Sequence, residues 1–105
     1  MTTTVRATSA FESPLYGDKP RRRIPGTTAV AVTMSRSDDN SVREYAIFTA
    51  DGMGWLGRAY WTPKRKAWSA GYTMASSPTH RDEKFANLAE FATVMAERLE
   101  LDVTA

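Results

Sequence analysis

The stretch that decides the fold is YWTPKRKAW, residues 60–68, in which three cations and a proline separate two tryptophans. The four residues PKRK, 63–66, have the composition of an exposed hairpin loop. With this loop length, Trp61 lies directly opposite Trp68 on the neighbouring strand. Directly opposed residues share one face of an antiparallel sheet. The stretch therefore predicts a hairpin with both tryptophans on one face and the cations at its tip.

Alternating apolar residues on either side of this hairpin predict a four-stranded antiparallel meander with short, turn-rich connections. The expected strands are Thr28 to Ser35, Val42 to Ala50, Trp55 to Thr62 and Ala67 to Ala75. Extending the hairpin parity places Val42, Ala46, Phe48 and Ala50 on the face that carries the three tryptophans. We expect this face to form the core, because large aromatic side chains gain most from burial.

The two ends of the chain are expected to differ. A helix is predicted from about Thr79 to Leu101, with an N-cap at Ser77 or Thr79. Its apolar stripe, expected to cover the tryptophan face, contains Phe85, Leu88, Ala92, Met95 and Leu99. Residues 1–26 contain three prolines and are expected to form an extended, irregular arm. The predicted fold class is α+β: a basic arm, 1–26, and a ββββα domain, 27–105, whose C-terminal helix packs on one sheet face.

Composition narrows the classes of function. A chain of 105 residues suits one domain, and the absence of cysteine excludes disulfides and thiolate metal sites. The start, MTTTVRATSAFESP, lacks the apolar run of a signal peptide, and no stretch has the length and hydrophobicity of a membrane span. We therefore expect a cytoplasmic protein with no membrane partner.

Charge is distributed unevenly along the chain. Residues 1–27 carry five cations and two acids, a net +3, whereas residues 76–105 carry three cations and six acids, a net −3. A basic front half favours a polyanionic partner, such as nucleic acid or an acidic protein surface. Ordinary solvated charge is the alternative explanation.

The sheet face opposite the tryptophans is the candidate binding surface. In the expected register it carries Arg43, Tyr45, Arg58 and Tyr60. Arginines hold phosphates and tyrosine rings stack on bases, so this combination suits single-stranded nucleic acid. Further phosphate contacts are expected from the hairpin tip and from the arm, at Lys64, Arg65, Lys66, Arg21, Arg22 and Arg23. The alternative is a solvated face on which arginine stems or the N-terminal arm cover the tyrosines.

Motifs for catalysis are weak. GMGWLG, residues 52–57, has the spacing of a nucleotide-binding glycine motif, but a strand follows it where that motif requires a helix. His80 is the only histidine, and no sequence motif supports a catalytic triad around it. The acidic turn Asp38-Asp39-Asn40 lacks the spaced ligands of a calcium-binding loop. We expect no enzyme activity, no metal and no cofactor.

The leading hypothesis is a non-enzymatic nucleic-acid-binding or regulatory module of the single-strand type. The order ββββα is similar to the generic architecture of some single-strand binders, including the whirly type. The alternative is a protein-interaction or assembly subunit that docks through its arm and basic loop. A single helix is too narrow to cover a four-stranded sheet. The arm, through Phe11, Leu15 and Tyr16, is one candidate to cover the rest, and a second subunit in a homodimer, with contacts at Val94 and Leu101, is the other.

Overall fold

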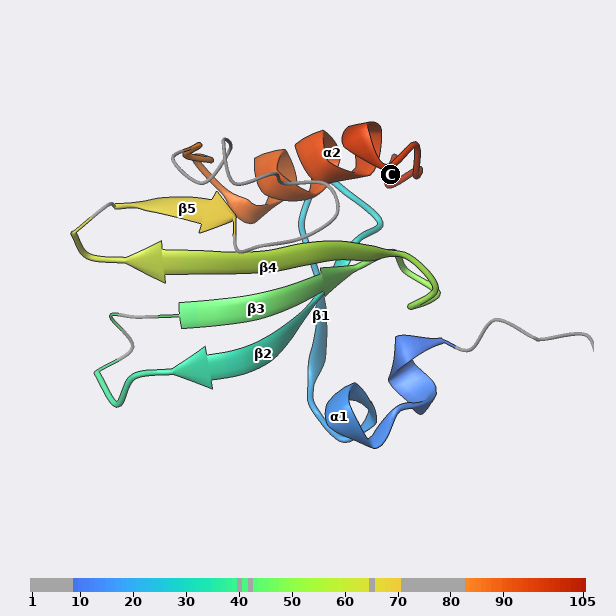
Figure 1. Ribbon diagram of the computed structural model, residues 1–105, viewed down its shortest axis with the longest axis horizontal. Coiled ribbons are helices and arrows are strands. Elements are labelled where there is room, and N and C mark those ends of the chain that lie inside the picture. The colour runs from blue at the N-terminus through green and yellow to red at the C-terminus, as the bar shows by residue number, and fades with distance from the viewer. Residues whose placement is uncertain (1–8, 40, 42, 65, 71–82) are drawn as a thin grey trace, which may run out of the picture.

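The computed structural model describes residues 9–39, 41, 43–64, 66–70 and 83–105. These residues form a five-stranded antiparallel sheet with the strand order β1-β2-β3-β4-β5, flanked by helical segments (Figure 1). The elements are η1 (Ala10–Glu12), α1 (Pro14–Gly17), β1 (Arg21–Arg23), β2 (Val30–Arg36), β3 (Arg43–Phe48), β4 (Trp55–Thr62), β5 (Ala67–Ala70) and α2 (Leu88–Arg98). The predicted α+β class, antiparallel sheet and C-terminal helix are confirmed, but the sheet has five strands and not four.

The fifth strand comes from the segment expected to be an irregular arm. The arginine tract forms β1, with Arg21 opposite Val32 and Arg23 opposite Val30. Ile24 continues the pairing through its N–H, which donates to the carbonyl of Ala29 at 2.9 Å. The expectation that this segment forms no regular element is wrong for Arg21–Arg23, because β1 lies at the edge of the sheet, where neighbouring prolines remove no ladder hydrogen bond.

The helix α2 begins later than its apolar periodicity predicts. Its N-cap is Asn87, whose side-chain oxygen accepts a hydrogen bond from the N–H of Glu90 at 2.8 Å. Phe85 lies before the helix and exchanges two backbone hydrogen bonds with Trp68. The caps expected at Ser77 and Thr79 lie outside the described residues, as does the part of the fourth expected strand from 71 to 75.

The hairpin of β4 and β5 has the predicted register, with Trp61 opposite Trp68 and Thr62 opposite Ala67. The register between β3 and β4 is correct only beside the turn, where Phe48 lies opposite Trp55. The next pair is Ile47 with Gly57, so β4 contains one extra residue at this point. Such a bulge reverses the sheet face of every residue that follows.

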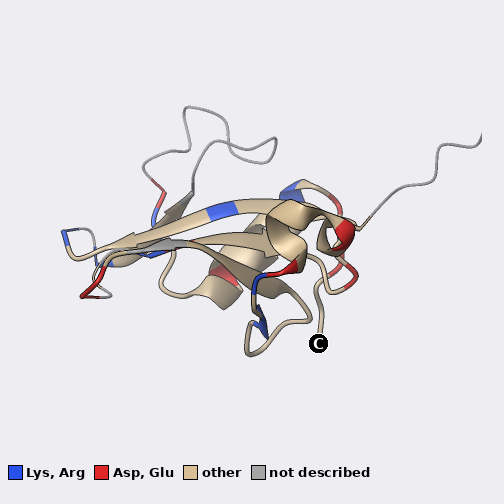
Figure 2. Cartoon of the chain, turned by 90° about the horizontal axis from the view of Figure 1, so that it is seen from below, with Lys and Arg blue, Asp and Glu red and all other residues tan. Residues whose placement is uncertain are grey.

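The core lies between α2 and the face of the sheet that carries Trp61 and Trp68. The helix packs chiefly against β4 and β5 and lies on one side of the sheet (Figure 2). Its buried residues join a cluster that includes Ile47, Leu56 and Trp68. The expected packing of the helix stripe on the tryptophan face thus holds for Trp68, which is buried, and Trp61 is half-buried. The expectation that all three tryptophans share this face is wrong, because Trp55 lies opposite Phe48 on the other face and is exposed.

A second apolar cluster lies on the opposite face, under the N-terminal segment. Phe11 and Tyr16 place their rings 5.8 and 5.1 Å from the ring of Phe48, both edge-on. Val32 and Ala46 complete the buried part of this cluster. The expectation that Ala46 and Phe48 share a face with Trp61 is wrong, because the bulge places them under the N-terminal segment instead.

Candidate nucleic-acid interface

The four residues expected to form one binding platform lie on two faces of the sheet. Arg43 pairs with Trp61, and Tyr45 pairs with Ala59, so both belong to the face covered by α2. Arg58 and Tyr60 alternate with those residues and point to the other face. The predicted platform is therefore wrong as a single surface, and the physical reason is the one-residue bulge in β4.

Arg43 lies against the rings of Trp61 and Trp68. Its guanidinium carbon is 4.7 Å from the ring centroid of Trp61 and 5.4 Å from that of Trp68. Its Nε is buried and has no hydrogen-bond partner among the residues that the structure describes. Arg43 thus serves first to cover the tryptophans, a role that sequence alone did not indicate.

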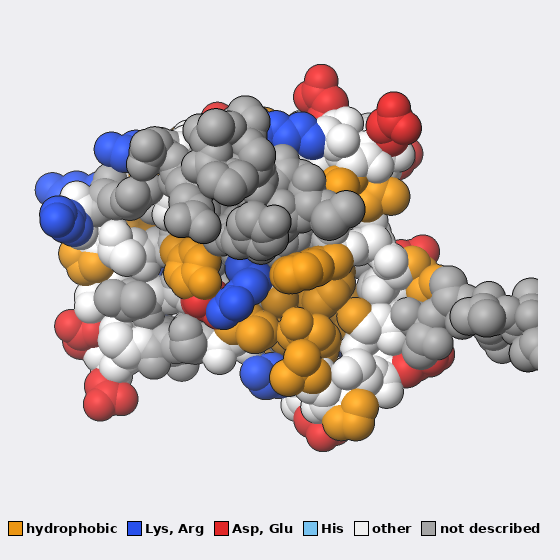
Figure 3. Space-filling view, viewed as in Figure 1, with side chains coloured by type: hydrophobic (Ala, Val, Ile, Leu, Met, Phe, Trp, Pro, Cys, Tyr) orange, Lys and Arg blue, Asp and Glu red, His pale blue; other side chains and the backbone are white. Residues whose placement is uncertain are grey.

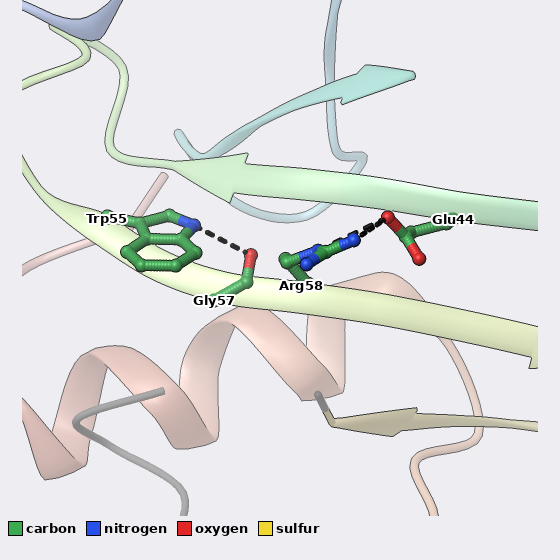
Figure 4. Close-up of polar contacts among 4 residues, drawn as sticks. All are labelled: Glu44, Trp55, Gly57 and Arg58. Atoms are coloured by element: carbon green, nitrogen blue, oxygen red, sulfur yellow. Dashed lines mark hydrogen bonds and ion pairs between the residues drawn. The ribbon is translucent and has the colours of Figure 1, made fainter. Parts of the chain in front are cut away.

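Arg58 is already paired within the chain. Its guanidinium forms an ion pair and hydrogen bonds with the carboxylate of Glu44, which is largely buried (Figure 4). This hydrogen bonding raises the pKa of Arg58 above its ordinary value. Burial raises the pKa of Tyr60, and hydrogen bonding with Glu44 adds to that shift. The pairing neutralises Arg58, so this half of the expected platform offers little net charge to a phosphate.

The remaining expected cations lie in two separate places. Lys64 and Lys66 are exposed at the tip of the β4–β5 hairpin, while Arg65 lies outside the described residues. Arg21 to Arg23 are exposed along β1, on the opposite edge of the sheet. Figure 2 shows Lys and Arg spread along the molecule, and on the face drawn in Figure 3 they are scattered among hydrophobic side chains. On the face drawn in Figure 3, the Lys and Arg side chains of the described residues form no continuous basic surface.

A pocket of about 480 Å³ lies between the sheet, at the side where β1 forms its edge, and the start of α2. It lies beside the area where α2 packs on β4 and β5. Small side chains, Ala31 and Thr33, line it from β2, while the rings of Tyr45 and Trp68 form an aromatic wall. The centroids of these two rings are 5.5 Å apart, with the planes inclined at 44°.

The pocket combines apolar walls with cations at its rim. Arg22 and Arg23 both line it, and both are exposed. The other lining residues are Pro20, Ile24, Pro25, Asn87, Leu88 and Ala89. None of the described lining residues is acidic, so a negatively charged group meets no like charge in the lining. Sequence reasoning selected Tyr45, Arg22 and Arg23 for binding but missed the pocket, because it assigned them to different surfaces.

The helix N-terminus at this pocket is largely satisfied internally. Asn87 accepts from the N–H of Glu90, and the carboxylate of Glu90 accepts from the N–H of Ala86 at 3.1 Å. This reciprocal capping adds a negative charge at the first turn, which opposes anion binding by the helix dipole. The arginines of β1, and not the helix, are therefore the groups that would attract an anion.

Other kinds of site find little support in the part of the chain that is described. No group of three histidine, cysteine or acidic side chains lies close enough to hold a metal ion there. None of the helices found there has the length and apolar character to cross a membrane. The glycines of GMGWLG lie in the β3–β4 turn and in β4, and a strand follows them as expected. His80 lies outside the described residues.

Comparison with protein-family models, with curated proteins and with solved structures finds no match for this chain.

Proposed function

We propose that the protein is a non-enzymatic module that binds single-stranded nucleic acid along β1. The observation that carries this proposal is the position of three consecutive exposed arginines beside an aromatic-walled pocket. Among the described residues, none of the three forms an ion pair with an acidic side chain. Unpaired guanidinium groups can contact successive phosphates, and nearby aromatic rings can stack on bases.

An edge strand can carry charge for another reason. Short, charged edge strands protect a sheet from pairing with other chains, and β1 has three residues, all arginine. Edge protection accounts for the charge of β1 but not for the pocket beside it, which has two arginines and no acid in its described lining. The arginines of β1 together with the adjacent pocket favour a ligand-binding role for this part of the molecule.

The test is a titration of fluorescein-labelled single-stranded DNA, single-stranded RNA and duplex DNA, followed by anisotropy at two salt concentrations. We expect the single strands to bind more tightly than the duplex, with an affinity that falls steeply as salt rises. The variant Arg22→Gln should weaken binding. Absence of binding to every oligonucleotide at low salt would contradict the proposal.

Assembly with a second copy of the chain is a second candidate function, favoured by exposed apolar side chains at another place. Met53 and Trp55 are 46% and 45% exposed, and Leu101 is 37% exposed. Leu101 lies against the β3–β4 turn, where its Cδ1 would be 2.8 Å from a Cβ placed on Gly54. These side chains form a patch of the kind found at protein interfaces.

The N-terminal segment is less suited to docking on a neighbour. Its rings at Phe11 and Tyr16 already pack on the chain's own sheet. Val94 is half-buried against the core cluster, so of the two contacts expected for a dimer only Leu101 is exposed. Sedimentation velocity should show a dimer in the micromolar range that Trp55→Ser dissociates, and a monomer throughout that range would remove this candidate.

A further inference from the structure

We propose that the pocket between β1 and α2 receives one unstacked base of the bound strand. This inference rests on the proposed function and adds to it the element that distinguishes a single strand from a duplex. A base within a duplex is stacked and paired, and it cannot enter a pocket without leaving the helix. A base in a single strand is free to enter.

The size and lining of the pocket suit such an occupant. A volume of about 480 Å³ lies within the range typical of small-ligand sites, which are mostly apolar with a few polar groups. Ala31 and Thr33 contribute short side chains to the lining, and the aromatic residues Tyr45 and Trp68 line the same space. Every base has an aromatic face, so stacking on these rings needs no particular sequence.

The polar groups in the pocket have capacity for the edges of a base. The hydroxyls of Thr33 and Tyr45 have no hydrogen-bond partner in the described part of the chain. The oxygen of the Asn87 side chain accepts from Glu90, which leaves its amide N–H groups as donors. These groups can pair with carbonyl and ring nitrogen atoms on a base, whereas a purely apolar side chain would leave them unpaired.

Charge connects the pocket to β1. Arg22 belongs to β1, lines the pocket and lies opposite Ala31, which also lines it, so a phosphate held by the Arg22 guanidinium brings its own nucleotide to the pocket mouth. Arg21 does not line the pocket. Its guanidinium carbon lies 4.4 Å from the ring centroid of Phe11, on the face away from α2. The strand β1 thus contains both a pocket arginine and a matched arginine that faces elsewhere.

The test compares a short fluorescein-labelled oligothymidylate with an abasic sugar–phosphate chain of the same length. Wild-type protein should bind the oligothymidylate on the order of tenfold more tightly than the abasic chain, because only the former can stack. Tyr45→Leu should abolish that difference, and Tyr45→Phe, which keeps the ring, should preserve most of it. Both variants must retain the wild-type circular dichroism spectrum and unfold cooperatively.

The arginines provide a second pair of variants. Arg22→Gln should weaken binding of both chains, and Arg21→Gln should have the smaller effect on the oligothymidylate. Chemical shifts of the Ala31, Thr33 and Trp68 amides should move when thymidine 5′-monophosphate is added at millimolar concentration, since the mononucleotide offers the same base and phosphate.

The results separate the inference from the function on which it rests. If oligonucleotides bind but Tyr45→Leu leaves the preference over the abasic chain intact, the base pocket is wrong and the binding module stands. If no oligonucleotide binds the wild-type protein, both are wrong. If an acidic peptide containing phenylalanine shifts the pocket amides and thymidine monophosphate does not, the pocket serves a protein partner and the inference is overturned.

Discussion

Arg43 and Trp61 face each other across β3 and β4, and the guanidinium carbon lies 4.7 Å from the centroid of the indole ring. The same group also covers Trp68, so a single cation closes one side of the tryptophan pair. A cation over an aromatic ring contributes about 0.5–2 kcal/mol, depending on its exposure to water. The β4–β5 hairpin, which carries the basic tip, is therefore stabilised by the contact of Arg43 with the two tryptophans as well as by the backbone hydrogen bonds between its strands.

The first prediction concerns this contact. Arg43→Ala should lower the free energy of unfolding by about 1–2 kcal/mol, because both the cation–ring contact and the cover over the rings are lost. Arg43→Met should lower it by less than half as much, since methionine restores the cover and removes the buried Nε that lacks a described partner. Urea denaturation monitored by tryptophan fluorescence measures both. Equal losses for the two variants would show that apolar cover contributes nothing.

The ion pair between Glu44 and Arg58 should respond asymmetrically to loss of either partner. The side chain of Arg58 is 40% exposed, whereas that of Glu44 is 10% exposed. Arg58→Gln should lower the free energy of unfolding by about 2 kcal/mol, because it leaves a largely buried carboxylate without its cation. Glu44→Gln should cost about 1 kcal/mol, since the arginine can turn to water. Thermal and urea unfolding of both variants measure these changes. A larger loss of unfolding free energy for Glu44→Gln than for Arg58→Gln would contradict this prediction.

Stability should depend on pH through Tyr60 in alkaline solution. Burial and hydrogen bonding with Glu44 raise its pKa above the ordinary value of 10.0. The folded protein then holds this proton more tightly than the unfolded chain, so its stabilising contribution is complete below pH 10 and is lost as pH rises through the folded pKa. Wild-type protein should lose more stability than Tyr60→Phe in urea denaturations performed on either side of pH 10. Identical pH profiles would mean that the raised pKa has no effect on folding.

Gly57 should tolerate substitution worse than Gly26. Both have positive φ angles, +128° and +85°, but Gly57 is buried in β4 at the bulge, whereas a Cβ at Gly26 would meet no atom within 4 Å. Gly57→Ala should lower the free energy of unfolding by about 2–3 kcal/mol, and Gly26→Ala by about 1 kcal/mol. Chemical denaturation of the two variants tests this order. A smaller loss for Gly57→Ala would indicate that the bulge relaxes to accept a side chain.

Binding of single-stranded oligonucleotide should carry a salt dependence that reports the arginines of β1. Each phosphate contact on a single strand contributes about −0.7 to the slope of log affinity against log salt. Arg22→Gln should reduce the magnitude of the slope by about 0.7, and the double variant Arg22→Gln with Arg23→Gln by about 1.4. Anisotropy titrations over a range of salt give the slopes, with Glu97→Gln on the exposed face of α2 as a control that leaves the slope unchanged.

The sequence predicted the β4–β5 hairpin in detail because its loop length and composition leave one register that places both tryptophans on the apolar face. It also predicted correctly that Phe48 shares a face with Trp55 beside the next turn. One extra residue between the pairs Phe48–Trp55 and Ile47–Gly57 then reversed the faces of the rest of β3. Alternation alone cannot reveal a bulge, because Gly57 reads equally well as a regular strand position covered by an aromatic neighbour.

The candidate site was predicted in its residue types but not in its arrangement. Tyr45, Arg22 and Arg23 were selected for stacking and phosphate contact, and they line one pocket. The pocket depends on where α2 packs and on the pairing of β1 with β2, and both are tertiary relationships that no local pattern specifies. Arg58 was selected for its charge, yet its partner Glu44 becomes apparent only when the bulge places both on one face.

Val103 and Thr104 pair with a segment beside the pocket. The N–H of Thr28 donates to the carbonyl of Val103 at 3.0 Å, and Thr27 pairs with Thr104, next to the Ile24–Pro25 segment that borders the hollow. An affinity tag or fluorescent fusion appended after Ala105 would therefore begin two residues after Thr104, which forms this bridge. Such an attachment could depress ligand binding with no change to any binding residue, so measurements of affinity should use protein from which a C-terminal fusion has been removed.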